Sequence, residues 1–181
     1  MSYDLLFVRV RPNETTGDVA TRDRDDPLGP VDPQKEVVKQ RLATALLSLD
    51  KSLKRFAFDF AKIAKLRKIS LEQARQEFRH VELNDDKTGI QITLFDDEAA
   101  ITVPYWHESG PATAVFKRIM AQAAVITRES GLVAYDPQLG KAINPVADIE
   151  QMVATYGSMV AAMTAHRQQH LRQGKPWWKF W

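Results

Sequence analysis

The four histidines are the first residues to consider, because imidazole serves both as a metal ligand and as a general acid or base. His166 and His170 lie four positions apart on a predicted helix, a spacing that metal-binding pairs use. A zinc-protease helix needs Glu directly after the first His, however, and Arg167 occupies that position. No third ligand lies nearby in the sequence. We therefore interpret the pair as part of a solvated helix face and predict no metal site.

A second candidate is His107 in PYWHESG, which follows a predicted strand and has Glu108 and Ser109 beside it. These are the residue types of a nucleophile and its base. Adjacent residues of an extended chain point to opposite sides, however, and no G-x-S-x-G turn is present. A catalytic site would instead have to gather His107 and Glu108 with Tyr135 and Asp136 at one end of the sheet.

Other motifs that carry chemistry are missing from the sequence. There are no cysteines, so thiol catalysis, disulfides and cysteine-ligated metals are excluded, and neither a dinucleotide-binding glycine motif nor a P-loop is present. The acidic clusters at 23–26, 85–86 and 96–98 lack the spacing of a calcium loop. The last two fall in predicted hairpin turns, where aspartate is favoured for turn geometry. We predict no catalytic residue and no cofactor.

The overall charge excludes a strong global electrostatic field. The 181 residues include 25 Lys or Arg and 23 Asp or Glu, a net charge of +2. The local basic stretch from Lys51 to Lys68 has apolar residues interleaved, which favours a solvated amphipathic helix over a nucleic-acid footprint. The apolar run near the N-terminus is too short for a signal peptide, and no stretch approaches the length of a membrane span. These features predict a cytoplasmic protein that does not bind nucleic acid.

The periodicity of the apolar residues predicts an α+β fold. Residues 3–10 form an apolar run that is typical of a central strand, 80–105 predict a three-stranded antiparallel meander, and LVAYDPQ predicts a further strand. Helices are predicted from Asp32-Pro33, over about 51–68, from Ser70, over about 109–131, and from Asn144-Pro145 to about Leu171. The simplest packing is a single, mostly antiparallel sheet with helices on it. We expect a ferredoxin-like split βαβ arrangement with extra helices and a long C-terminal helix.

One domain is predicted over residues 1–173, with a polar loop at about 11–31 that we expect to be mobile. The tail over 174–181, GKPWWKFW, is strongly aromatic. Ordering such a segment must offset its chain entropy, so we expect its rings to be covered. We favour packing on the same molecule. Docking into a protein partner and contact with a membrane surface are the alternatives.

The segment VPYWHESGPATAVFKRIMAQAAVITRESGLVAYDPQLGKAI resembles one that recurs in small bacterial proteins of polymorphic-toxin systems. In those proteins a strand that ends in an aromatic pair leads into a helix, and then into a strand that finishes in a Tyr-Asp-Pro-Gln turn. Many of them are similar to immunity proteins, which bind and block a cognate toxin, including effectors delivered by type VI secretion. The resemblance covers about residues 98–143 and, loosely, the first strand.

The resemblance implies a bacterial protein that binds a cognate toxin or effector and catalyses nothing. The acidic first loop, Glu14 through Asp26, is a candidate contact if the toxin is basic. The candidate partner-binding residues lie on two strand exits and in the tail: Tyr105, Trp106, His107, Tyr135, Asp136, Gln138, Trp177, Trp178 and Trp181. Two alternatives remain open. One is an enzyme of unknown reaction with a site near His107, Tyr135 and Asp136, and the other is a membrane-peripheral accessory protein that uses the aromatic tail.

Overall fold

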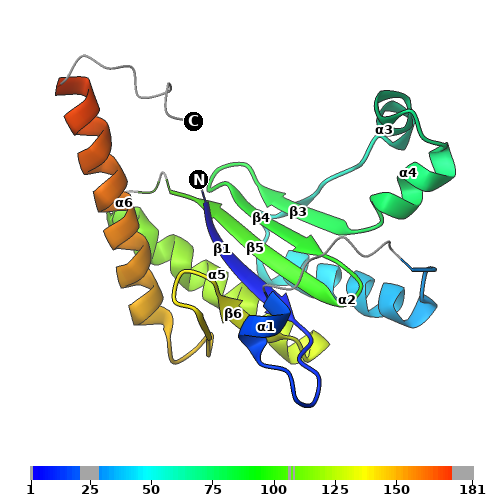
Figure 1. Cartoon of the computed structure of the whole chain (residues 1–181), viewed down its shortest axis with the longest axis horizontal. Helices are drawn as coiled ribbons and strands as arrows, with labels where there is room; N and C mark the ends of the chain where they lie inside the picture. Colours follow the sequence, from blue (N-terminus) through cyan, green and yellow to red (C-terminus); the bar gives the residue numbers. More distant parts are fainter. Residues whose placement is uncertain (1, 21–28, 106, 108, 173–181) are drawn as a thin grey trace.

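A computed structural model of the chain describes residues 2–20, 29–105, 107 and 109–172 (Figure 1). The strands are β1 (Ser2–Val8), β2 (Lys54–Arg55), β3 (Val81–Asp85), β4 (Ile90–Leu94), β5 (Glu98–Pro104), β6 (Val133–Asp136) and β7 (Lys141–Ala142). The helices are α1 (Thr16–Ala20), α2 (Pro33–Leu49), α3 (Phe60–Arg67), α4 (Leu71–Glu77), α5 (Ser109–Ser130) and α6 (Ile149–Arg172). Within these ranges no helix combines the length and the apolar character that crossing a bilayer requires.

The strands form one seven-stranded antiparallel sheet in the order β2-β3-β4-β5-β1-β6-β7. The predicted α+β class and the β3-β4-β5 meander are confirmed. Strand β1 is central, as its apolar run predicted, with Leu5 opposite Ile101 of β5 and Leu6 opposite Tyr135 of β6. The ferredoxin-like arrangement stays a prediction.

Helices α2 and α5 cover one face of this sheet, and α6 packs beside α5 (Figure 1). Alternation along β1 turns Tyr3, Leu5 and Phe7 toward the helices, where all three are fully buried. Helix α5 buries Phe116, Ile119, Ala123 and Ile126, whose spacing places them on one stripe. The main core therefore lies between the sheet and its two covering helices.

The helix boundaries follow the local signals in the sequence. Asp32 caps α2 by accepting a hydrogen bond from the backbone N–H of Gln34 at 2.8 Å. Ser70 and Gln73 form the predicted capping box of α4, since each side chain accepts from the other's backbone N–H. Gly131 ends α5 with a φ of 69°, a conformation that costs glycine little.

Three sequence-based expectations were wrong. The predicted helix over 51–68 is helical only from Phe60, because residues 54–55 pair with β3 as strand β2. The loop expected over 11–31 contains the short helix α1, and its residues 21–28 lie outside the described ranges. The last helix begins at Ile149 rather than at Asn144-Pro145: residues 145–147 form a turn, in which the backbone N–H groups of Val146 and Ala147 donate to the Asn144 side chain.

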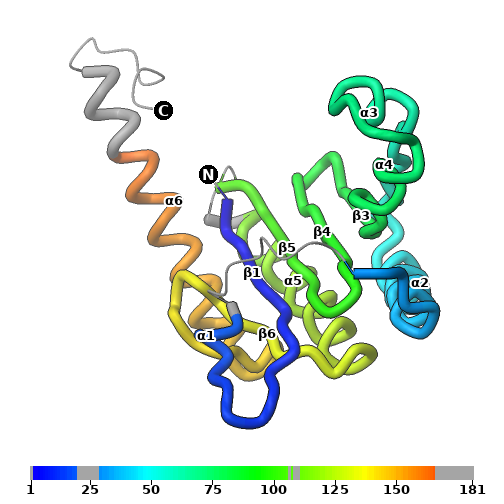
Figure 2. The backbone as a smooth tube through the Cα atoms, turned by 45° about the vertical axis from the view of Figure 1, so that its right-hand side comes forward, coloured from blue at the N-terminus to red at the C-terminus, as the bar shows by residue number. Residues whose placement is uncertain are grey.

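Helices α3 and α4 form a hairpin that stands out from the β2-β3 edge of the sheet (Figures 1 and 2). Helix α3 contains no buried residue, and in α4 only Ala74 is buried. The hairpin is therefore attached to the body mainly through its ends, next to β2 and β3.

Candidate functional site

The two strand exits that the sequence analysis singled out do meet at one end of the sheet. The Tyr3 hydroxyl of β1 donates to Oδ2 of Asp136, the last residue of β6, and both residues are fully buried. Oδ1 of Asp136 accepts from the backbone N–H groups of Gln138 at 2.8 Å and Leu139 at 3.1 Å. In the orientation that satisfies its hydrogen bonds, the Gln138 amide also donates to Asp136 and to the carbonyl of Asp4. Asp136 thus fixes the turn between β6 and β7 from the inside.

Tyr105 lies in an aromatic cluster that joins α6 to the sheet. Its ring stacks on Tyr156 of α6 with the centroids 5.4 Å apart, and its hydroxyl donates to Sδ of Met159. Burial raises the pKa of Tyr105 to about 12 and also raises that of Tyr156. Burial and the hydrogen bond to Asp136 raise the pKa of Tyr3 further. These phenols therefore stay protonated at neutral pH.

His107 is buried beside this cluster but bonds to a different part of the fold. Its Nε2 lies 2.8 Å from the carbonyl oxygen of Thr88, in the turn between β3 and β4, so this nitrogen donates. Its backbone N–H donates to Oη of Tyr156 at 3.4 Å. The imidazole therefore helps to hold the β3-β4 turn against the end of β5.

Tyr135 faces the opposite side of the sheet from the helix-covered core. Tyr135 lies opposite Leu6 and is buried beneath α1. Its hydroxyl is close to Gly17 of α1: a Cβ atom added to this glycine would lie 3.7 Å from it. His107 and Tyr135 therefore do not come together as an active site would require. Trp106, Trp177, Trp178 and Trp181 lie outside the described residues, as does Glu108. A partner-binding role for all these residues stays a prediction.

Sequence reasoning missed a buried polar network that ties α5 to the end of α2 and to the β3-β4 turn. The Arg118 guanidinium donates to Asp50 at 2.7 Å and to Asp85 at 2.8 Å, and the Gln122 amide donates to Asp50 at 2.8 Å. Burial alone would raise the pKa of Asp85, but hydrogen bonds from Arg118, Thr88 and a backbone N–H hold it well below its usual range. No motif could have revealed the network, because its members come from distant parts of the sequence.

The sheet face opposite α2 and α5 carries mostly polar, partly exposed residues over β3, β4 and β5. Cross-strand rows on this face run Asn84, Gln91, Thr102, Asp4 and Glu82, Thr93, Ala100, Leu6, all of them partly exposed. The two rows contain two acidic residues, Asp4 and Glu82, and no Lys or Arg. We call these two rows the acidic sheet face.

An aromatic groove lies at the base of the α3–α4 hairpin. It has a volume of about 360 Å³ and is lined by residues 55–58, 60 and 78–81, with Gln40 of α2 on one side. Phe56 is 49% exposed and Phe95, beside His80, is 39% exposed. Large apolar side chains on a surface mark interaction sites when they gather in one place.

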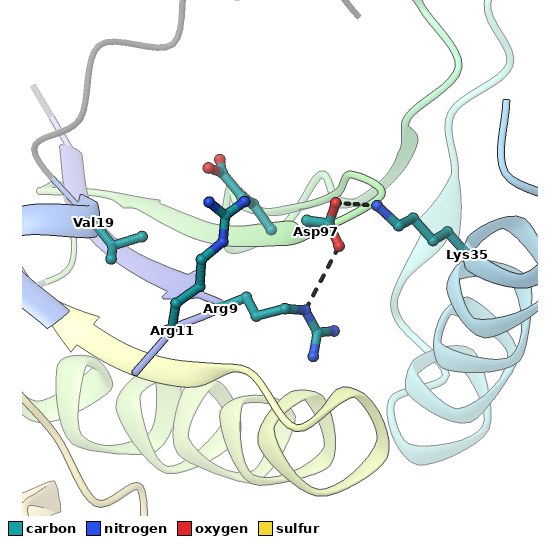
Figure 3. Close-up of a pocket in the computed structure, with 6 residues that line it drawn as sticks. Arg9, Arg11, Val19, Lys35 and Asp97 are labelled. Atoms are coloured by element: carbon teal, nitrogen blue, oxygen red, sulfur yellow. Dashed lines mark hydrogen bonds and ion pairs between the residues drawn. The ribbon is translucent and has the colours of Figure 1, made fainter. Parts of the chain in front are cut away.

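Figure 3 shows another hollow, of about 430 Å³, between β1 and α2. Arg9 and Lys35 both point toward Asp97, with Arg9 Nε 3.6 Å from its carboxylate and Lys35 forming a hydrogen-bonded ion pair. One carboxylate pairs with both cations, so these three residues together leave a net charge of about +1 in the hollow. We assign no function to it.

Comparison of the chain with protein-family models, with curated proteins and with solved structures found no match. The resemblance to immunity proteins therefore rests on the sequence segment alone, and the functional argument rests on the surfaces described above.

Proposed function

We propose that this chain is a protein-binding, non-catalytic immunity protein that works in the cytoplasm by binding and neutralising a cognate toxin. The observation that carries the proposal is the acidic sheet face, a broad polar surface that no described helix covers over β3, β4 and β5 (Figure 1). A broad polar face of this kind can form a protein interface, because such interfaces cover a wider area than the concave sites that hold small ligands.

The charge of the face supports a basic partner. Asp4 and Glu82 supply carboxylates, and the threonines, glutamine and asparagine of the rows supply neutral hydrogen-bonding groups. Complementary charge speeds the encounter of two proteins and suppresses wrong partners. An inhibitor that must capture a toxin before it acts gains most from fast association.

The state of the candidate catalytic residues also favours binding over chemistry. Asp136 is enclosed by Tyr3 and by the backbone of the β6-β7 turn, and His107 bonds to Thr88. A general acid or base must reach the proton that it transfers. Side chains that are buried and engaged within the fold are better suited to shaping the scaffold behind the binding face.

Affinity capture followed by a toxicity assay tests this function. The wild-type chain and the variant with Glu82→Lys and Thr102→Arg are used as bait in lysate of the source cells. Glu150→Lys is the matched control, because it reverses an exposed charge on α6, away from the face. We expect one stoichiometric protein to be retained by the wild type and the control and to bind the double variant at least about tenfold more weakly.

The retained protein is then expressed alone and together with each variant. The proposal requires that it arrests growth alone and that the wild type, but not the double variant, restores growth. A partner that is not toxic, or one that the double variant still neutralises, contradicts the proposal.

A further inference from the structure

The projecting hairpin carries an unusual share of the positive charge. Residues 51–79 contain nine of the 25 Lys and Arg residues of the chain but only three of its 23 Asp and Glu residues. The remainder therefore carries more acidic than basic residues, although the whole chain is close to neutral. The molecule is thus electrically divided, with a basic hairpin at the end of an acidic sheet. Such asymmetry points to an acidic ligand at the basic end.

The lysines of the hairpin are available for such a ligand. Lys62, Lys65 and Lys68 are exposed, and none of them forms an ion pair within the described part of the chain. Arg67 lies over the Phe78 ring at 5.3 Å and also pairs with Glu77 at 3.0 Å. Arg55 and Arg79 line the aromatic groove, whereas Lys62, Lys65 and Lys68 lie on the adjoining hairpin.

The groove itself is built from aromatic rings packed on one another. Phe58 lies at the centre and meets Phe56 at an interplanar angle of 79° and His80 at 77°. It also contacts Phe60 and Phe78 with centroids about 6 Å away. The pairs with Phe56 and His80 meet edge to face, whereas those with Phe60 and Phe78 are tilted at 33° and 52°. The groove, in which Phe56 is half exposed, offers a slot for an apolar side chain.

The hairpin also lacks the internal burial that normally stabilises a helix pair. Leu66 of α3 is 72% exposed and Leu71 of α4 is 44% exposed, and no side chain of α3 is buried. Helices in proteins owe most of their stability to packing of an apolar face. A partner that covers the groove and these leucines would supply that packing.

We infer that the α3–α4 hairpin and its aromatic groove bind an acidic segment of a protein, with apolar side chains entering the groove and carboxylates facing the adjoining lysines. Charge complementarity decides the occupant, because a basic segment would meet the like charges of Lys62, Lys65 and Lys68, which have no ion-pair partner among the described residues. Recognition of an amphipathic segment by an apolar groove is a common mode of peptide binding. This surface lies at the β2-β3 edge, whereas the toxin is proposed to bind the open sheet face, so the inference does not depend on the proposed function.

Selection from a random peptide library displayed on phage tests the inference. The full chain is the target, and the variant with Phe56→Ala and Phe60→Ala, which shortens two residues of the groove lining, is used for counter-selection. We expect enriched peptides to combine Leu, Phe or Trp with several Asp or Glu. Peptides without acidic residues, or no enrichment over the counter-selected pool, overturn the inference.

The affinity of an enriched peptide is then measured by fluorescence polarisation. Phe56→Ala and the pair Lys62→Glu with Lys65→Glu should each weaken binding by at least about tenfold. If Phe56→Ala destabilises the fold, the variant with Lys62→Glu and Lys65→Glu still tests the inference, because it changes only exposed side chains. Val146→Ala, which shortens another highly exposed apolar residue far from the groove in sequence, should leave the affinity unchanged.

A labelled single-stranded RNA of mixed sequence serves as the competing ligand. If the RNA binds more tightly than every selected peptide, the hairpin is a nucleic-acid surface and the inference is wrong. Asp4→Lys with Thr102→Arg changes the acidic sheet face and no residue that lines the groove, so that variant should bind the peptide normally. Peptide binding and toxin binding can therefore fail separately.

Discussion

Arg118 illustrates how single residues hold distant parts of this fold together. Its guanidinium donates to both Asp50 and Asp85, and the Asp85 side chain is only 3% exposed. Removing the cation leaves two carboxylates close together without their main partner. We expect Arg118→Ala to lower the free energy of unfolding by about 2–3 kcal/mol, measured by urea denaturation. Arg118→Lys should lose less, because it keeps the charge. Equal stability of all three proteins would contradict a stabilising role for the network.

Asp85 makes a separate prediction about acid. Its pKa in the folded protein lies well below its usual range, chiefly because hydrogen bonds from Arg118 and Thr88 outweigh the effect of burial. A carboxyl with a depressed pKa contributes stability that is present above its unfolded pKa of about 4 and is lost as the pH falls below that value.

We therefore expect the stability of the wild type to decrease between about pH 4 and pH 2, measured by denaturation at each pH. Asp85→Asn should start from a lower stability at pH 7 and lose less of it over the same range. Parallel pH profiles of the two proteins would show that Asp85 is not the group responsible.

At the scale of elements, the α3–α4 hairpin should be the least protected of the larger helical units. Amide protection follows burial, and α3 has no buried side chain, whereas the strands β1, β4 and β5 lie in the centre of the sheet. Native-state hydrogen exchange should show α3 opening at a lower free energy than β1 or α5. Equal protection in the free protein would mean that the hairpin is stabilised by contacts other than those described.

Tyr156 is a main anchor of helix α6 on the sheet, together with Met152, which is also fully buried. Tyr156 is fully buried, packs against Tyr3, Tyr105 and Phe116, and donates to the carbonyl oxygen of Pro104 at 2.7 Å. Tyr156→Ala creates a cavity and should cost about 3–5 kcal/mol. Tyr156→Phe removes only the hydroxyl and should cost about 1 kcal/mol. Thermal denaturation of both variants measures the contributions of the ring and of the hydroxyl to stability. If the two variants lose similar stability, the hydroxyl contributes more than the ring.

The elements also show what sequence patterns can and cannot predict. The alternation of Ile90, Ile92 and Leu94 identified the meander, because a strand with one buried face leaves that period in the sequence. The spacing of Leu53 and Phe56 was helical by chance, since pairing of residues 54–55 with β3 overrides the local preference. Short strands at a sheet edge depend on their neighbour and leave little pattern of their own.

The candidate site was harder to predict than the fold. The turn at Asp136 was found because aspartate and proline mark turns, but its burial beneath Tyr3 depends on contacts between residues far apart in sequence. The network around Arg118 and the acidic sheet face arise in the same way, from strands and helices that meet only in three dimensions. The phenylalanines at 56, 58 and 60 are the part of the aromatic groove that is visible in the sequence. They were not recognised as a site, because the segment was interpreted as a helix.

The whole molecule is close to neutral yet divided in charge, and this division leads to the last prediction. A protein with a net charge of +2 should bind a cation-exchange resin weakly if only its total charge counted. If the basic hairpin acts as a local patch, however, the protein should bind at low salt, because unscreened charges attract over about 10–30 Å. Lys62→Glu with Lys65→Glu should then elute at a clearly lower salt concentration than the wild type.

The control for this prediction changes the total charge equally but at a different place. Lys117→Glu with Arg128→Glu reverses two charges on α5 and leaves the hairpin intact. This variant should elute close to the wild type, since the patch that binds the resin is unchanged. If the two double variants elute together, retention follows the total charge. The separation into an acidic face and a basic hairpin would then not affect the long-range electrostatic attraction of partners.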